Sequence, residues 1–221
     1  MDNTRHIFIS KDASNSVLLC NYLDHNGWTY TAKSLLSFER VTIPNEVTPV
    51  SILFFASPRS FDFYVQQRSI STELIACAGS STAKYIQDRG FEVSYFPILS
   101  GNVTDASRAF AQWVDGSTVG FSVSDLSKQS YAQFLSVDQV VIIPTYKTTF
   151  VEDSIPPSDI YVFTSPSNVD AFLKFNTLSE NAKVISWGET TTKHLKQLNI
   201  VPYATLAISS DEALIQVLKH L

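Results

Sequence analysis

Two short runs of residues occur twice in this chain, in the same order, and this repeat limits the possible folds more than any other feature. FFASPRSFDFY at residues 54–64 returns as VFTSPSNVDAF at 162–172, and AGSSTAKYIQDRGF at 78–91 returns as WGETTTKHLKQLNI at 187–200. Equivalent positions lie 108 residues apart in the first pair and 109 apart in the second. Because 221 residues can form two cores of roughly 100 residues each, we expect a duplicated domain.

Each copy of the repeat has the pattern strand, Ser-Pro turn, helix, strand, glycine turn, helix and a further strand. Most of the expected strands are apolar on both faces, which is typical of a parallel sheet covered by helices on both sides. The fold class is therefore α/β, with doubly wound parallel sheets. Strands are expected at residues 6–10, 51–57, 74–79, 92–97, 118–123, 160–165, 183–188 and 201–206.

The helix boundaries carry their own signals. Ser57 and Ser165 each precede a proline and are expected to cap a helix. Gly90 aligns with Asn199, and these two residue types most readily adopt the left-handed conformation that ends a helix. A final helix is expected near the C-terminus. Its apolar stripe consists of Leu214, Val217, Leu218 and Leu221. Ser209 and Glu212 have the spacing of a capping box at its start.

The chain order predicts a discontinuous first domain, residues 1–35 with 155–221, and a second domain, residues 45–138, inserted in it. Two extended segments, 36–44 and 139–154, are expected to act as linkers running side by side. Pro144 has no backbone N–H, so the second linker is expected at a sheet edge or in an isolated pairing. Such an arrangement would leave a cleft between two lobes.

Composition and charge exclude several classes. A net charge of −5 argues against nucleic-acid binding, although a small anion could still bind where positive groups are local. No run reaches the roughly 18 apolar residues of a membrane-spanning helix, and the N-terminus lacks a signal-peptide pattern. We therefore expect a cytoplasmic protein that does not bind membranes. A monomer is a separate expectation.

The cysteines and histidines show no ligand spacing. Cys20 and Cys77 each lie inside an apolar segment and are expected to be reduced core residues. The four histidines do not form a metal-binding pattern, so no metal site is expected. Neither a catalytic triad nor a phosphate-binding loop is present.

The repeated turns are the candidate binding elements. In open α/β sheets, ligands bind beyond the carboxyl ends of the strands, where helix N-termini present unpaired N–H groups. The turns could instead serve only as helix caps, and that alternative is open at this stage. If the turns do bind a ligand, four helix N-termini would together bind several carboxylates or phosphates in the cleft.

Side chains that could assist binding are few. Lys11, Arg59 and Lys147 lie near the expected turns or linkers, although such residues are often solvated surface charges. Tyr146 lies in the second linker, where it could pack between lobes or donate a hydrogen bond or proton to a substrate.

In order along the chain, the motifs KDA, LSFE, FFASPRS, AGSSTA, TYKT, VFTSPSNV and WGETTTKHL resemble those of uroporphyrinogen-III synthases. The resemblance implies two flavodoxin-like domains joined by a two-stranded linker, and activity without a metal or cofactor. It also implies the substrate hydroxymethylbilane, a linear tetrapyrrole with eight carboxylates. The reaction removes water, closes the ring and inverts ring D through a spiro intermediate, giving uroporphyrinogen III.

The resemblance assigns the role of proton donor to Tyr146. It assigns substrate binding to the turn residues and to one lysine, namely Lys11, Ser57, Arg59, Thr82, Ser165, Ser167, Thr190 and Thr191. Two departures concern the first copy of the repeat: Ala56 replaces the usual threonine, and residues 121–130 lack a basic-Gly turn. A non-catalytic module that binds an anionic metabolite, and a structural duplication without a ligand, are the alternative interpretations.

Overall fold

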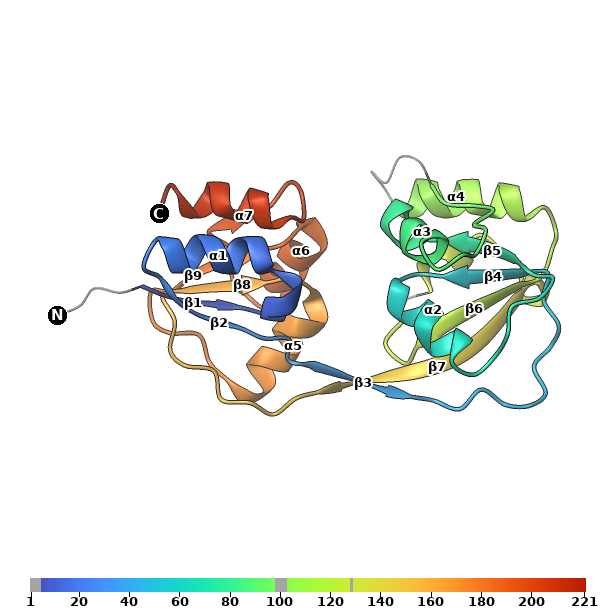
Figure 1. Cartoon of the computed structure of the whole chain (residues 1–221), viewed down its shortest axis with the longest axis horizontal. Coiled ribbons are helices and arrows are strands. Elements are labelled where there is room, and N and C mark those ends of the chain that lie inside the picture. Colours follow the sequence, from blue (N-terminus) through green and yellow to red (C-terminus); the bar gives the residue numbers. More distant parts are fainter. Residues whose placement is uncertain (1–4, 98–102, 128) are drawn as a thin grey trace. The chain divides into compact units, whose positions relative to one another are not determined.

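The computed structural model describes residues 5–97, 103–127 and 129–221 and divides the chain into two compact units. The first unit consists of Met1–Ser37 and Thr149–Leu221, and the second of Phe38–Thr148. Each unit is built on its own five-stranded sheet (Figure 1). The two boundaries fall inside the segments expected as linkers, and the structure assigns most of both segments to the second unit.

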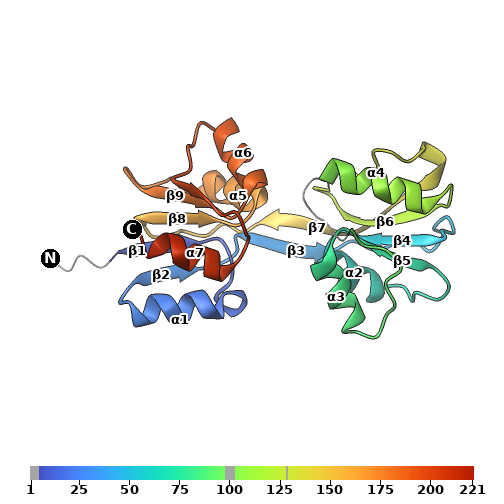
Figure 2. The same cartoon turned by 90° about the horizontal axis from the view of Figure 1, so that it is seen from above.

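The sheet of the first unit is parallel. Its strands follow the order β10-β9-β8-β1-β2, and Figure 2 shows β9, β8, β1 and β2 side by side. In chain order this is 2-1-3-4-5, the flavodoxin-like arrangement. The strands are β1 (His6–Ile9), β2 (Thr29–Ala32), β8 (Ile160–Phe163), β9 (Lys183–Ser186) and β10 (Ala204–Thr205).

Helices cover both faces of this sheet. Ile7 and Ile9 point to one face and pack with α1 (Val17–His25) and α7 (Asp211–Leu218), whereas Phe8 points to the other. There it packs with α5 (Pro166–Phe175) and α6 (Glu189–Gln197). In Figure 1, α1 and α7 lie above the sheet and α5 lies below it. A short 3-10 helix, Ala13–Asn15, precedes α1.

The sheet of the second unit has the order β3-β7-β6-β4-β5. The pairs β4–β5, β4–β6 and β6–β7 are parallel. The N–H of Val41 donates to the carbonyl of Thr145, and the N–H of Val151 to that of Leu35, so the chain segments of β3 and β7 run antiparallel. The bounds are β3 (Leu36–Arg40), β4 (Ile52–Phe55), β5 (Leu74–Cys77), β6 (Val119–Ser124) and β7 (Val140–Phe150).

Helices also cover both faces of the second sheet. Phe55 and Cys77 pack on one face with α2 (Pro58–Val65) and α3 (Ser80–Gln87). Phe54 and Phe121 pack on the other with α4 (Val103–Val114) and the 3-10 helix Ser130–Ala132. A second 3-10 helix, Val137–Gln139, precedes β7.

Equivalent strands occupy equivalent places in the two sheets, and this confirms the predicted doubly wound α/β class. β8 and β9 are the repeat counterparts of β4 and β5, and a further parallel strand flanks each Ser-Pro strand, β1 beside β8 and β6 beside β4. Because β1 comes from the start of the chain whereas β6 follows its repeat, one unit is a circular permutation of the other. The two strands before the first repeat, β1 and β2, therefore complete the first sheet.

Two expected strands are much shorter than predicted. Residues 92–97 contribute one isolated bridge, between Ala76 and Tyr95, and residues 201–206 contribute only the two residues of β10. Both segments pair with one neighbour at a sheet edge, and each contains a proline, Pro97 or Pro202, that cannot donate a ladder hydrogen bond.

The expectation for Pro144 was wrong, because β7 lies between β3 and β6 and not at an edge. The register with β6 shifts here: Val123 pairs with Pro144, but Ser124 pairs with Tyr146. Thr145 is therefore the extra residue of a bulge. Since a bulge already interrupts the ladder, the missing N–H of the adjacent proline is tolerated.

The helix signals were mostly confirmed. Gly90 and Asn199 both have the predicted positive φ, +84° and +59°. The capping box Ser209–Glu212 was wrong: Ser210 caps α7 by accepting from the N–H of Ala213, and Ser209 donates to the carbonyl of Trp187. None of the helices within the described residues is long and apolar enough to cross a membrane.

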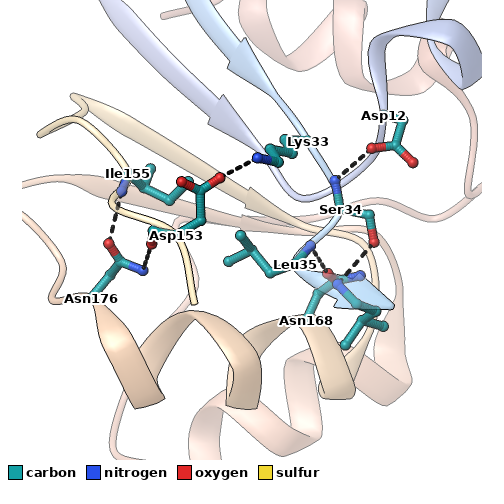
Figure 3. A network of polar contacts seen from close by, with 9 residues as sticks. Asp12, Lys33, Ser34, Leu35, Asp153, Ile155, Asn168 and Asn176 are labelled. Carbon is teal, nitrogen blue, oxygen red and sulfur yellow. Dashed lines mark hydrogen bonds and ion pairs between the residues drawn. The ribbon is translucent and has the colours of Figure 1, made fainter. Parts of the chain in front are cut away.

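Polar contacts anchor the segments by which the chain leaves and re-enters the first unit (Figure 3). Lys33 forms an ion pair with Asp153, which holds the pKa of that carboxyl below its usual value. The N–H of Leu35 donates to Oδ1 of Asn168 at 3.2 Å. On the return, Asn176 accepts from the N–H of Ile155 at 2.8 Å and donates to the carbonyl of Asp153 at 2.9 Å.

Candidate functional site

In each unit, the parallel strands bring the predicted turns to one edge of the sheet. In the first unit Ile9 pairs with Val162, and Phe163 with Ser186. Lys11, the Ser165 turn and the Gly188 turn therefore follow neighbouring strand ends.

The second unit has the same arrangement. Phe55, at the end of β4, pairs with Cys77 on one side and Ser122 on the other. The turns that begin at Ser57 and Gly79 therefore lie at the carboxyl edge of this sheet.

Both Ser-Pro turns cap their helices as predicted. Oγ of Ser57 accepts from the N–H of Ser60 at 3.2 Å, and Oγ of Ser165 accepts from that of Asn168 at 3.3 Å. Proline at the first helical position has no N–H to satisfy. The next N–H in each helix belongs to Arg59 or Ser167, and neither has a hydrogen-bond acceptor among the described residues. Capping thus leaves one donor at each turn for an anion.

The glycine turns leave more donors. Gly79 and Gly188 are the N-caps of α3 and α6, and a glycine has no side chain to accept from the first turn. Within the described part of the chain, the N–H groups of residues 80–82 and 189–191 have no acceptor. Thr82 and Thr191 are buried at the third position of their helices, whereas Thr190 is exposed. Such helix starts favour carboxylates or phosphates.

The three candidate cations differ in whether a carboxylate already binds them. Nζ of Lys11 lies 3.2 Å from Oδ1 of Asp211, and Nζ of Lys147 lies 2.8 Å from Oε2 of Glu39. The hydrogen bond to Glu39 raises the pKa of Lys147. No carboxylate within the described ranges forms an ion pair with Arg59.

Aromatic rings surround Arg59 and Tyr146. The guanidinium carbon of Arg59 lies 3.4 Å from the centre of the Phe38 ring, a cation–π contact. Phe38 meets the ring of Tyr146 edge-on, with centroids 6.0 Å apart and planes at 68°. On α2, one turn after Arg59, Phe63 stacks on Tyr146 with centroids 5.0 Å apart and planes at 14°. We call Phe38, Arg59, Phe63 and Tyr146 the aromatic cluster.

The ring of Tyr146 is buried, but its hydroxyl is accessible to solvent. The residue is 9% exposed, and no described residue hydrogen-bonds to Oη. Because no buried side-chain oxygen or nitrogen among the described residues lacks a partner, Oη must reach solvent. A tyrosine held by its ring with an open hydroxyl can act on a bound ligand.

Sequence reasoning did not identify Phe38 and Phe63. Phe63 follows Arg59 by four residues, the spacing of neighbours on one helix face, so the pattern could have indicated it. Phe38 had no such signal, because its contact with Tyr146 depends on β3 pairing beside β7.

A pocket of about 270 Å³ opens at the carboxyl edge of the second sheet. Its lining is mainly apolar and includes no charged side chain among the described residues. The lining includes several residues of the segment 121–130, which lacks the basic-Gly turn. This part of the sheet edge therefore suits an apolar ring better than a carboxylate. The lining includes Phe54, Ala78, Phe121, Ser122, Gln129 and Tyr131.

A larger pocket, of about 400 Å³, lies in the first unit away from the candidate residues. It is lined by Arg5, Asp159 and Lys183, at the amino ends of β1, β8 and β9. The described residues contain no group of three or more His, Cys, Asp or Glu side chains that could hold a metal ion.

Comparisons with known proteins bear on the fold and on the family. No protein with a curated description matches the sequence significantly. A solved uroporphyrinogen-III synthetase from Helicobacter pylori is similar with a TM-score of 0.71 and 18% identity, over 98% of this chain and 99% of that one. A mutant uroporphyrinogen III synthase from the extremely thermophilic bacterium Thermus thermophilus gives a TM-score of 0.63 and 9% identity, over 98% of each chain.

These two structures establish a shared fold. The sequence itself supplies the family: the model described as uroporphyrinogen-III synthase HemD matches residues 19–216, which is most of the chain. This chain therefore belongs to the uroporphyrinogen-III synthase family.

Proposed function

We propose that this chain converts hydroxymethylbilane into uroporphyrinogen III, with Tyr146 as the proton donor. The terminal hydroxyl of the substrate takes the proton of Tyr146, its C–O bond breaks, and water leaves. The carbon left electron-poor is attacked by ring D, which is inverted through a spiro intermediate as the macrocycle closes. The proton released from ring D on closure can restore the tyrosine.

The observation that carries this proposal is the environment of Tyr146. Its ring is fixed between Phe38 and Phe63, its hydroxyl reaches solvent, and Arg59 lies in the same cluster. The cluster thus combines a positioned hydroxyl with a cation that has no carboxylate partner among the described residues, which suits a substrate with a leaving hydroxyl and carboxylates.

The turns supply the remaining binding groups. In the part of the chain that the structure describes, the Ser57 and Ser165 turns each leave one backbone N–H without an acceptor, at Arg59 and at Ser167. The glycine turns likewise leave the N–H groups of their first helical residues without an acceptor there. We propose that substrate carboxylates bind these donors, assisted by the hydroxyls of Thr82, Thr190 and Thr191. Many dispersed donors suit an octacarboxylate better than one dense charge cluster, since the chain as a whole carries a charge of −5.

A role in substrate binding is less well supported for Lys11 than for Arg59. Its ammonium is paired with Asp211 and lies 5.1 Å from the centre of the Trp187 ring. We propose that it binds substrate only by sharing its charge between Asp211 and a carboxylate.

The direct test supplies freshly made hydroxymethylbilane to the purified chain, then oxidises and separates the products. We expect the type III isomer to predominate. If only the spontaneous type I isomer forms, the proposed function is wrong, and binding without conversion would favour a non-catalytic tetrapyrrole-binding module.

The role of Tyr146 is tested by Tyr146→Phe. General acid catalysis contributes about 10²- to 10⁴-fold, so we expect turnover to fall by at least about 100-fold with little change in the melting temperature. Tyr64→Phe is the matched control: it makes the same chemical change in a buried tyrosine of α2, in the neighbouring hydrophobic core. Unchanged turnover in Tyr146→Phe would remove the residue from this role.

We also propose that the enzyme works as a cytoplasmic monomer and binds no nucleic acid. Cys20 and Cys77 are both free and buried, which suits a reducing compartment. The acidic charge opposes phosphate binding. Light scattering after size-exclusion chromatography measures the mass in solution, and a value of twice 24.6 kDa would contradict the monomer.

A further inference from the structure

We propose that Phe63 is a positioning residue for the reaction, because its ring sets the direction of the Tyr146 hydroxyl. This inference rests on the proposed role of Tyr146 as proton donor. It adds a residue to which neither the sequence motifs nor the resemblance assigned a role.

The contact between the two rings is close and nearly parallel. Their centroids are 5.0 Å apart and their planes differ by 14°. Phe38 meets the same tyrosine ring edge-on from β3. With one aromatic ring stacked on its face and a second in T-shaped contact, the Tyr146 ring has little freedom to tilt. Because Oη lies at the far end of this ring, the two contacts also fix the direction of the hydroxyl.

Phe63 is itself held firmly. It belongs to α2, whose neighbouring residues Phe61 and Tyr64 are buried in the core of the second unit. The same helix begins with the capping box of Ser57 and Ser60. Phe63 is only partly buried, so it can be replaced without opening that core.

The backbone of Tyr146 is fixed independently. Thr145, the extra residue of the bulge, is fully buried, and its hydroxyl hydrogen-bonds to Oγ of Ser122 at 3.0 Å and to the carbonyl of Val123 at 3.3 Å. Bulges often re-aim a side chain beside an active site. The bulge therefore fixes the backbone position of Tyr146, and Phe63 fixes the orientation of its ring.

Replacing the ring by a smaller side chain should let the tyrosine lean into the space beside its face. A misplacement on the order of 1 Å can cost as much as about 100-fold in rate. For Phe63→Leu we expect the kcat for type III formation to fall by about 10- to 100-fold. KM should change by less than about threefold, because Phe63 offers the carboxylates no hydrogen bond.

Two further variants separate positioning from general packing. Phe63→Tyr keeps the aromatic face, and its kcat should stay within about threefold of the parent. Phe134→Leu is the control, since it removes another partly exposed aromatic ring in the second unit that contacts an arginine, Arg108 at 4.5 Å. It should leave kcat unchanged.

The decisive measurement is a double-mutant cycle with Tyr146→Phe. If Phe63 acts through the tyrosine hydroxyl, Phe63→Leu should lower the residual kcat of Tyr146→Phe by less than about twofold. A full, additive loss in that background would overturn the inference, as would wild-type kcat in Phe63→Leu itself. Melting temperatures of all variants identify any loss that is due to unfolding.

The failures of the two proposals are distinguishable. If the parent chain yields only the type I isomer, the proposed function fails. If the parent yields the type III isomer and the cycle is additive, only the positioning role of Phe63 fails.

Discussion

The hydroxyl of Tyr85 donates a hydrogen bond of 2.7 Å to Oδ2 of Asp62, which ties α3 to α2. The repeat counterpart in the first unit joins Nε2 of His194 to Oδ1 of Asp170 at 2.6 Å and ties α6 to α5. Both aspartates belong to the first repeated run and both partners to the second. The recurrence of aspartate in the sequence therefore has a structural cause, which is the contact between two neighbouring helices in each unit.

Tyr85→Phe should weaken the second unit, because it removes this hydrogen bond. We expect the free energy of unfolding to fall by about 1 kcal/mol, measured by urea denaturation at pH 7. The hydrogen bond to Asp62 raises the pKa of Tyr85, so its stabilisation is present below pH 10.0 and is lost as the pH rises through the raised pKa. The stability of the variant should therefore depend less on pH above 10.0. An equal alkaline loss in both proteins would contradict this account.

Asp211→Ala should destabilise the first unit. Asp211 accepts from the N–H of Leu19 and the hydroxyl of Ser16, both at 3.4 Å, and so caps α1 in place of Ser16. Losing such a cap costs about 0.5–2 kcal/mol in unfolding free energy, typically about 1 kcal/mol. Asp88→Ala is the control: it breaks an exposed pair between Lys84 of α3 and the C-cap residue Asp88, and it should cost less than about 0.5 kcal/mol. Equal losses would mean that Asp211 is no cap.

Arg59→Gln should weaken substrate binding more than it slows turnover. The guanidinium rests on Phe38 and has no carboxylate partner among the described residues, so it can bind a substrate carboxylate. We expect KM to rise by roughly 5- to 20-fold, which corresponds to about one charge-assisted hydrogen bond. Arg108→Gln removes an arginine with a similar ring contact and should leave KM unchanged. A KM equal to that of the parent would leave Arg59 with a packing role only.

His6 should make the first unit less stable in mild acid. Partial burial lowers the pKa of His6 below its ordinary value of 6.5, and the Asp159 carboxylate opposes this only in part. The unfolded chain then binds a proton at a higher pH than the folded chain, so stability falls as the pH drops below 6.5. His6→Gln should show a smaller decrease in chemical denaturation between about pH 7.5 and 5.5. Parallel curves for the two proteins would contradict the prediction.

The local elements were largely predictable from the sequence, because their causes are local. Ser57 and Ser165 cap helices through hydrogen bonds that span three residues, and Gly90 and Asn199 end helices through their own backbone conformation. The strand β2 and the helix α4 were not identified. β2 has only four residues and lacks a clear alternating pattern, so the sequence contained too little signal.

The candidate site was predictable only in part. Tyr146, Arg59 and the turns were named from their positions in the motifs, and these assignments are still predictions. What the motifs could not indicate is that Asp211 pairs with Lys11 from 200 residues away, or that Glu39 pairs with Lys147. Both contacts decide which cations are available to a ligand.

The sequence by itself determined that the chain contains one α/β unit twice and which turns lie at the strand ends, because repetition, apolar runs and caps act over a few residues. Only the tertiary structure decided that one unit is a permuted copy of the other, and that Phe38 and Phe63 hold Tyr146. These features depend on which strands and helices pack together. Non-local packing leaves no periodic pattern in the sequence, so the three-dimensional fold was needed to find it.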